Sequence, residues 1–174
     1  VPTASQLEDI GDRYQKLFEE LGAGNTHWLP ISDRNDAKKE EYVIQLESCT
    51  GIFITGGNQL RLSTILGGTP IAKTIRKLNA QGVHVAGTSA GAAIVSQHMI
   101  TGGNTGIVPT EDGVNLAPGL GLINTVVVDQ HFNERNRLSR LLSAVSYNPF
   151  LLGLGLDEDT AAFIDGDNDF TVVG

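Results

Sequence analysis

Residues 83–95, VHVAGTSAGAAIV, decide the fold of this chain. A short apolar run enters the stretch, and a run of small residues that favour a helix leaves it. Residues 87–91 between them fit the pattern G-x-S-x-G, which forms a nucleophile elbow when a strand precedes it and a helix follows. Such a tight turn exposes Ser89, requires small neighbours, and points helix N–H groups at the site. The alternative is an ordinary glycine-rich turn in which Ser89 caps the helix.

The bulk composition limits the class of protein and its partners. A length of 174 residues suits one domain with a sizeable core. The formal net charge of −8 argues against broad nucleic-acid binding, which needs a basic face. No apolar run is long enough to span a bilayer, so we expect no membrane partner. Because Cys49 is the only cysteine, it has no internal disulfide partner, which fits a reducing compartment. We expect a cytoplasmic protein, and a secreted form stays open because the chain starts at Val1 and not at Met.

Predicted strands and helices alternate along the chain. This alternation predicts an α/β fold with a mostly parallel sheet and helices on both faces. We expect one domain over residues 1–174, cut within strand-like runs at both ends. The predicted strands lie at residues 1–4, 26–31, 51–55, 83–88 and 122–129, with short strands in 150–174 separated by turns at 157–159 and 165–167. The predicted helices start at a capping box at residues 5–8, at Asp33 or Asp36 (running to about Cys49), at Gln59, at Pro70, at Ser89 and at Asn133, and residues 101–118 form a glycine-rich loop.

A serine nucleophile needs a base, usually histidine, and the chain has four histidines. His98 lies nine residues after Ser89 on the same predicted helix, about 13 Å away. His84 and His27 lie near the starts of strands, at the wrong edge of the sheet. His131 follows a strand of three valines, at the carboxyl edge where open α/β sheets carry their sites. We interpret His131 as the base, although a lone histidine is more often structural.

The acid that orients the base should lie at the same edge. Glu158 follows the apolar run 151–156, which predicts another strand, so the triad order would be Ser, His, Glu. This order differs from the Ser, acid, His order of the α/β-hydrolases. Asp129 is too close to His131 in sequence to be the obvious orienting acid, but it is positioned to line the site. Residues 56–57, two glycines that follow a predicted strand, either supply a second oxyanion donor or form an ordinary strand-to-helix turn.

Three arginines follow His131 closely, which is unusual in an acidic chain: Arg135, Arg137 and Arg140. Arginine binds carboxylates through paired hydrogen bonds, so the cluster favours an acidic ligand. The alternative is a solvated helix face on which Arg137 and Arg140, three residues apart, pair with acids.

Four segments in order resemble the cyanophycinases. They are GGNQLR at 56–61, GTSAGA at 87–92, DQHF at 129–132 with the three arginines that follow, and DEDTA at 157–161. Cyanophycinases are serine peptidases related to the aspartyl dipeptidase peptidase E, and their fold is similar to that of class I glutamine amidotransferases, a flavodoxin-like arrangement. The resemblance covers nearly the whole chain. It departs at the ends, because cyanophycinases have a glycine-rich first strand before residue 2 and continue beyond residue 174.

The resemblance implies a serine exopeptidase that hydrolyses cyanophycin, a poly-aspartate with arginine on each side-chain carboxyl, to β-Asp-Arg dipeptides. It implies that Ser89 attacks, that His131 transfers the proton, and that Glu158 orients the imidazolium. The N–H groups of Gly57 and Ala90 would hold the oxyanion. The implied substrate-binding residues are Asn58, Asp129, Gln130, Arg135, Arg137 and Arg140. The resemblance implies a homodimer that uses neither a metal nor an organic cofactor.

Two other functions stay open at this point. One is a small-peptide hydrolase such as an aspartyl dipeptidase of the peptidase E kind, although the arginine cluster favours the arginine-bearing polymer. The other is a binding module on the same fold, in which the three triad residues are present but not aligned.

Overall fold

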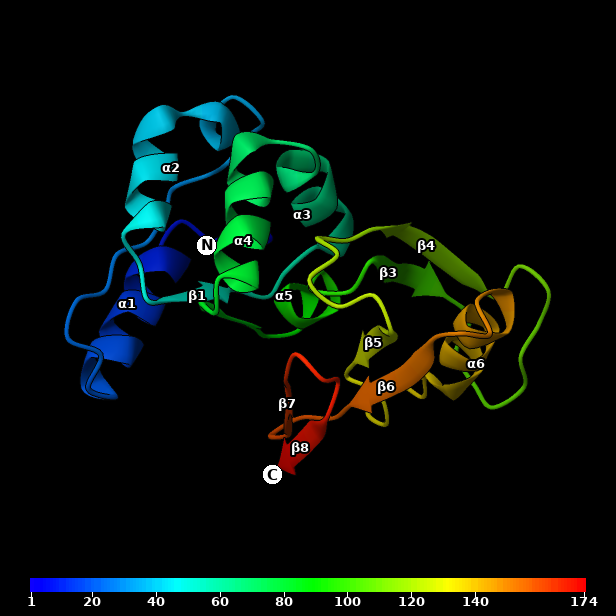
Figure 1. Cartoon of the computed structure of the whole chain (residues 1–174). Coiled ribbons are helices and arrows are strands. Elements are labelled where there is room, and N and C mark those ends of the chain that lie inside the picture. The colour runs from blue at the N-terminus through cyan, green and yellow to red at the C-terminus, as the bar shows by residue number, and fades with distance from the viewer. The chain divides into compact units, whose positions relative to one another are not determined.

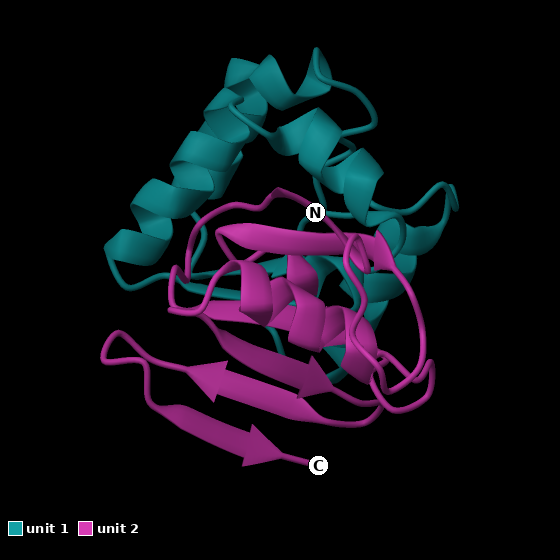
Figure 2. Ribbon diagram, turned by 90° about the vertical axis from the view of Figure 1, so that its right-hand side faces the viewer, with its two compact units in different colours: residues 1–92 teal, residues 93–174 magenta.

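Each half of the chain contains its own pair of parallel strands and its own buried core. The computed structural model describes all residues, 1–174, and divides them into two compact units, Val1–Ala92 and Ala93–Gly174 (Figures 1 and 2). The boundary falls inside the short helix α5 (Ala90–Ala93).

Unit 1 consists of helices around one parallel strand pair. Its elements are α1 (Ile10–Glu20), the 3-10 helix η1 (Asp36–Lys38), α2 (Glu40–Glu47), β1 (Gly51–Ile54), α3 (Gln59–Leu66), α4 (Pro70–Ala80) and β2 (His84–Gly87). Strands β1 and β2 are parallel, with Ile54 opposite Gly87. Side chains cap two helices, because Asn58 Oδ1 accepts the Arg61 N–H at 2.8 Å and Thr69 Oγ1 accepts the Ala72 N–H at 3.4 Å. Fully buried side chains form the core: Ile54, Leu62, Leu66, Ile71 and Ile75.

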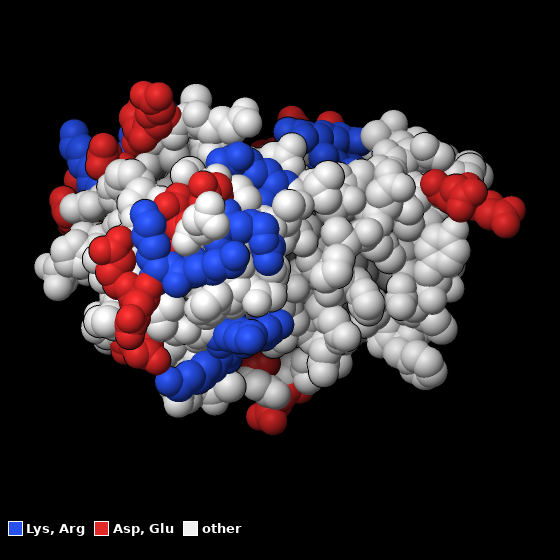
Figure 3. Space-filling view, turned by 90° about the horizontal axis from the view of Figure 1, so that it is seen from above, with Lys and Arg blue, Asp and Glu red and all other residues white.

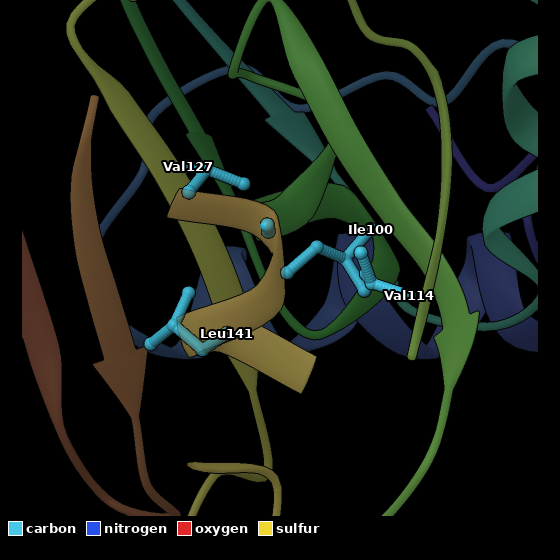
Figure 4. Close-up of a cluster of buried hydrophobic side chains, with 5 residues drawn as sticks. Ile100, Val114, Val127 and Leu141 are labelled. Carbon is cyan, nitrogen blue, oxygen red and sulfur yellow. The ribbon is translucent and has the colours of Figure 1, made fainter. Parts of the chain in front are cut away.

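Unit 2 contains one helix and three pairs of strands besides the end of α5. The elements are β3 (His98–Gly103), β4 (Val114–Pro118), β5 (Val126–Gln130), α6 (Leu138–Tyr147), β6 (Leu152–Leu156), β7 (Ala161–Ile164) and β8 (Phe170–Val173). Strands β5 and β6 are parallel, while β3–β4 and β7–β8 are antiparallel. Ile100, Val114, Val127, Leu141 and Ala144 form a buried cluster between α6 and the strands (Figure 4). This cluster packs α6 against the middle of β5 through Val127.

Several sequence predictions are confirmed. The strand at 51–55 is β1, the helix pair after it is α3 and α4, and the strand before Ser89 is β2. The strand expected at 122–129 is present as β5, one residue longer at its carboxyl end and shorter at its start. The predicted turns at 157–159 and 165–167 separate β6, β7 and β8.

Other predictions near the N-terminus are wrong. Residues 1–4 and 26–31 form no strand, and the helix expected from the capping box begins only at Ile10. The Ser5 hydroxyl accepts the Leu7 N–H at 3.1 Å, a local turn that competes with a helix cap. The helix expected from Asp33 or Asp36 to Cys49 is split, because the extended backbone of Lys39 separates η1 from α2.

The region after Ser89 also differs from prediction. Helix α5 ends at Ala93, so His98 begins strand β3 and does not lie on the helix of Ser89. The expected loop at 101–118 contains most of the antiparallel pair β3–β4. Because two strand pairs are parallel and two are antiparallel, the fold is mixed α/β. None of the helices is both long and apolar enough to cross a bilayer.

Candidate active site

Ser89 lies in a strand-to-helix turn that only small neighbours allow. It follows β2, precedes α5, and has a left-handed backbone with φ of +52°. A Cβ on Gly87 would lie 2.2 Å from the Gly91 carbonyl oxygen, and a Cβ on Gly91 would lie 2.0 Å from the Ile54 carbonyl oxygen. Both positions therefore require glycine, which explains the glycines of G-x-S-x-G by close backbone approach.

The end of β1 lies directly beside Ser89. The Thr88 N–H donates to the Ile54 carbonyl at 3.1 Å, and a Cβ on Gly56 would lie 3.1 Å from the Ser89 Cβ. Gly57 follows with φ of +143°, a conformation that favours glycine. The two strand ends thus bring the glycine pair and Ser89 to one edge of unit 1.

Two further predicted residues lie at this edge. Ala90 is the first residue of α5, and the first N–H groups of a helix have no acceptor within the helix. Asn58 is exposed and caps α3 through its side-chain oxygen. Gly57, Asn58, Ser89 and Ala90 therefore all belong to the carboxyl ends of β1 and β2 or the turns that follow them.

In unit 2, His131 and Glu158 meet at the carboxyl ends of β5 and β6. Gln130 and Leu156 are partners in the parallel register, so the residues that follow them leave the same edge. The Nδ1 atom of His131 is in hydrogen-bond contact with the Glu158 carboxylate. This contact is the main cause that holds the pKa of Glu158 below its usual value. The side chains are 26% and 45% exposed, respectively, so the pair is open to a ligand.

Neighbouring residues also connect the turn after β5 with the turn after β6. The Asp157 carboxylate accepts the Asn133 N–H at 2.6 Å, and the Phe132 N–H donates to the Leu156 carbonyl at 3.1 Å. A Cβ on Gly155 would lie 2.5 Å from the Phe132 ring, so the ring packs directly on the strand backbone. These contacts were not predicted from the sequence. The glycine inside the run 151–156 was the available signal, since glycine within a strand often marks a close approach.

Beneath His131 lies a buried network of charged and polar side chains. Asp129 and Arg140 are 0% and 5% exposed and form a two-point ion pair, with Arg140 Nε 2.7 Å from Asp129 Oδ2. Arg137, 7% exposed, donates to Gln130 Oε1 at 2.9 Å and also to the Gln130 carbonyl. Burial, followed by the neighbouring charge of Arg140, lowers the pKa of Arg137.

The three arginines therefore do not share one environment. Arg135 is exposed, whereas Arg137 and Arg140 are buried, so a solvated helix face is the wrong description of the latter two. Pairing with an acid is confirmed for Arg140 by its contacts with Asp129. That any of the three binds substrate stays a prediction.

The predicted site residues divide between the units. Gly57, Asn58, Ser89 and Ala90 lie in unit 1, and Asp129, Gln130, His131, Arg135, Arg137, Arg140 and Glu158 lie in unit 2. The structure brings together the glycine pair with Ser89, and separately His131 with Glu158. That Ser89 and His131 act together stays a prediction. No group of three or more His, Cys, Asp or Glu side chains is arranged to hold a metal ion.

The amino-acid sequence matches peptidase family S51 over residues 1–172, and the chain belongs to this family. Relatives named cyanophycinase match the whole of this chain. The chain is 46% identical to that of Nostoc sp. PCC 7120, covering 100% of this chain and 59% of the relative. It is 47% identical to that of Geminocystis herdmanii, covering 100% and 65%, respectively. The chain thus spans roughly three-fifths of the length of these relatives.

Solved structures support the mixed α/β peptidase fold. A peptidase from an acI-B1 Actinobacterium superposes with a TM-score of 0.74 at 28% identity, covering 99% of this chain and 72% of that one. A candidate peptidase E from Listeria monocytogenes EGD-e superposes with a TM-score of 0.65 at 24% identity, covering 99% and 82%. The second likeness concerns the fold alone.

Proposed function

We propose that this chain carries the active site of a serine exopeptidase that hydrolyses cyanophycin to β-Asp-Arg dipeptides. The observation that carries the proposal is the contact of His131 Nδ1 with the Glu158 carboxylate at the ends of two adjacent parallel strands. A carboxylate on Nδ1 leaves Nε2 as the proton acceptor, which is the state a serine base needs. Membership of the S51 family and similarity to relatives named cyanophycinase support the reaction class and substrate.

In this proposal Ser89 sits on a nucleophile elbow and attacks the backbone carbonyl of an aspartate residue. His131 takes the hydroxyl proton through Nε2 and then passes it to the leaving amine. Glu158 holds the imidazole tautomer and stabilises the imidazolium. Water then attacks the acyl-enzyme with His131 again as base, which restores Ser89. The left-handed backbone of Ser89 and the glycines around it support the elbow.

The N–H groups of Gly57 and Ala90 are the proposed oxyanion donors. Their support is that Gly57 directly follows Gly56, whose Cβ position lies 3.1 Å from the Ser89 Cβ, and that Ala90 directly follows Ser89 as the first residue of α5. Donors fixed by strand and helix backbone need no reorganisation when charge develops on the carbonyl oxygen. We propose the class I glutamine amidotransferase-like arrangement, with a mostly parallel sheet, for the whole fold. The parallel pairs β1–β2 and β5–β6 support it.

For the substrate, we assign the exposed side chains of Asn58 and Arg135 to direct contact. The guanidinium of Arg135 suits the carboxylate groups that cyanophycin presents. Asp129, Gln130, Arg137 and Arg140, which the sequence analysis also places in substrate binding, are buried, so they reach substrate only through what they hold in place. We expect Arg135→Lys to raise KM for cyanophycin by about tenfold, since lysine offers only a point charge.

The test is to incubate the purified protein with cyanophycin and identify the released dipeptide by mass spectrometry. Release of β-Asp-Arg supports the proposal, and cleavage of aspartyl dipeptides without attack on the polymer would favour the peptidase E-like alternative. Ser89→Ala should remove several powers of ten of activity while the protein still binds cyanophycin. Reaction of Ser89 with a serine-directed phosphonate separates an enzyme from a binding module.

We also propose that the chain unfolds as a single cooperative domain and that the protein is a homodimer. Light scattering measures the oligomeric state.

A further inference from the structure

Two arginines at the start of α6 form hydrogen bonds and an ion pair with the last two residues of β5. Arg140 binds the Asp129 carboxylate at two points, with Nε at 2.7 Å from Oδ2. Arg137, directly before α6, holds both the side chain and the carbonyl of Gln130, the next residue along the strand. Asp129 and Gln130 are buried, as are both arginines. Buried charges cost free energy unless they are paired and hydrogen-bonded. The position of this network in the fold indicates what the buried charges contribute.

The network ends at the peptide that leads into His131. The Gln130 carbonyl, which accepts from Arg137, belongs to the peptide whose nitrogen is that of His131. On the other side, the Arg137 N–H donates to the Phe132 carbonyl at 2.9 Å, and the Arg135 N–H donates to the His131 carbonyl at 3.1 Å. Side chain and main chain of Arg137 therefore hold the backbone both before and after His131.

This hold matters because His131 has a left-handed backbone, with φ of +51°. A non-glycine residue keeps such a conformation only when its surroundings enforce it, and such residues concentrate at functional sites. If the Gln130 carbonyl were released, the peptide would rotate toward a commoner conformation. The imidazole would then leave the direction that brings Nδ1 to Glu158.

We propose that Arg137 is a positioning residue, whose guanidinium fixes the backbone at His131 and thereby the direction of the imidazole, and that it is not a ligand of the substrate. The Asp129–Arg140 pair supports this role, because Asp129 Oδ1 also lies 3.6 Å from Arg137 Nη1 and compensates its charge. The proposal rests on the proposed function, since it takes His131 as the base for Ser89.

A substitution that keeps the charge distinguishes positioning from substrate contact. Arg137→Lys retains a cation but loses the planar fork that reaches the Gln130 carbonyl and Oε1 together. The matched control is Arg13→Lys, the same change at an exposed position of α1. Three quantities are measured: the second-order rate of inactivation by a small serine-directed fluorophosphonate, kcat and KM for cyanophycin, and the melting temperature.

Positioning predicts that Arg137→Lys lowers both the inactivation rate and kcat by about ten- to a hundredfold, with KM within about twofold. The fluorophosphonate carries no arginine or carboxylate, so a substrate ligand would leave its rate unchanged and raise KM. A purely structural role would lower the melting temperature while the folded protein reacts at the wild-type rate. Either of these two results overturns the proposal.

If Arg137→Lys does not fold, Gln130→Leu provides the second test. It leaves every charge in place but removes Oε1, the side-chain acceptor that orients the Arg137 guanidinium on the Gln130 carbonyl. Positioning requires that orientation, so it predicts a slower inactivation rate and an unchanged KM. The reactivity of the wild type separates failure of the proposed function from failure of the positioning role. An unreactive wild type that also fails to cleave cyanophycin rejects the proposed function and this role with it. A reactive wild type with an equally reactive Arg137→Lys or Gln130→Leu variant rejects the positioning role alone.

Discussion

At the scale of single residues, Ser89 and His131 share a backbone conformation that their residue types disfavour. Their φ values are +52° and +51°, and each follows the end of a parallel strand. A left-handed non-glycine residue costs on the order of 1–3 kcal/mol, which the rest of the fold must offset. Around Ser89 the offset comes from glycine packing, and around His131 it comes from hydrogen bonds to the flanking carbonyls.

Glu158→Gln is expected to lower kcat for cyanophycin by roughly 10²–10⁴-fold, because an amide neither fixes the same tautomer nor stabilises the imidazolium. The melting temperature should change little, since Glu158 is exposed. Because its pKa is lowered, Glu158 stays ionised as the pH falls through the usual range near 4.3. The contact with His131 is therefore lost only at lower pH. Glu134→Gln, at an exposed acid in the neighbouring turn, is the control, and an equal loss of kcat in both variants contradicts the role of Glu158.

Asp36 gives a prediction about stability and pH. Its carboxylate accepts the Ser32 N–H at 2.9 Å and the Ser32 hydroxyl at 2.8 Å, and it pairs with Lys39 at 2.8 Å. The hydrogen bond from Lys39, followed by those from Ser32, lowers the pKa of Asp36. The folded pKa lies below the unfolded value of about 3.9, so the carboxylate stabilises the fold above that pH and this is lost as the pH falls further.

Asp36→Asn should therefore cost about 1 kcal/mol of unfolding free energy at pH 7. The difference from wild type should shrink as the pH is lowered from 5 toward 3, measured by urea unfolding at each pH. A difference that stays constant over this range would mean that the charge of Asp36 does not contribute. Asp167→Asn, at an exposed turn, provides a variant with the same change and little expected effect.

At the scale of elements, the helices and strands nearest Ser89 were predictable because local signals and tertiary contacts agree there. Asn58 and Thr69 cap α3 and α4, and the glycines around Ser89 permit the close crossing with β1. Residues 26–31 carry strand-favouring side chains, but the Ile31 N–H bonds the Leu29 carbonyl at 2.8 Å and no ladder forms. Local composition does not determine whether a backbone N–H donates to a nearby carbonyl or to a neighbouring strand.

The antiparallel pair β3–β4 was missed for a different reason. Glycines in residues 101–118 read as a loop, whereas a Cβ on Gly103 would lie 2.5 Å from the Gly113 carbonyl oxygen. The register shifts between Ile100 and Gly102, so the glycines accommodate an irregular strand pair and do not interrupt it. The burial of Arg137 and Arg140 was likewise beyond the sequence, because it depends on the packing of α6 against β5.

Gly91→Ala tests the crossing of α5 over β1. The added Cβ would lie 2.0 Å from the Ile54 carbonyl oxygen, which is backbone and cannot turn away. We expect a loss of about 1–3 kcal/mol of unfolding free energy, measured by chemical denaturation, together with reduced reactivity of Ser89 toward a fluorophosphonate. Gly24→Ala has no heavy atom within 4 Å of the new Cβ and serves as the control. Equal stability of the two variants would show that α5 and β1 separate without cost.

At the scale of the whole molecule, the sequence predicts one domain, and the structure contains two compact units with separate cores. In the view of Figure 3, basic and acidic side chains lie side by side on the left of the face, and few charged side chains lie on the right, on a chain of net charge −8. Whether the two units unfold together can be tested directly. The only tryptophan, Trp28, lies in unit 1, so its fluorescence reports on that unit alone.

Val127→Ala supplies the perturbation in the other unit. Val127 is 0% exposed and belongs to the cluster of Ile100, Val114 and Leu141 (Figure 4). Removing two methyl groups there should cost about 2–3 kcal/mol, or roughly 4–12 °C in Tm for a chain of this size.

The Trp28 ring packs on Gly11 and its Nε1 donates to Asp12 at 2.9 Å, so its fluorescence follows the unfolding of unit 1. One cooperative domain predicts that Val127→Ala lowers the fluorescence midpoint as far as the circular-dichroism midpoint. If the units fold independently, the fluorescence midpoint stays at the wild-type temperature while circular dichroism resolves an earlier transition. That result would replace the single domain by two, each with its own buried core.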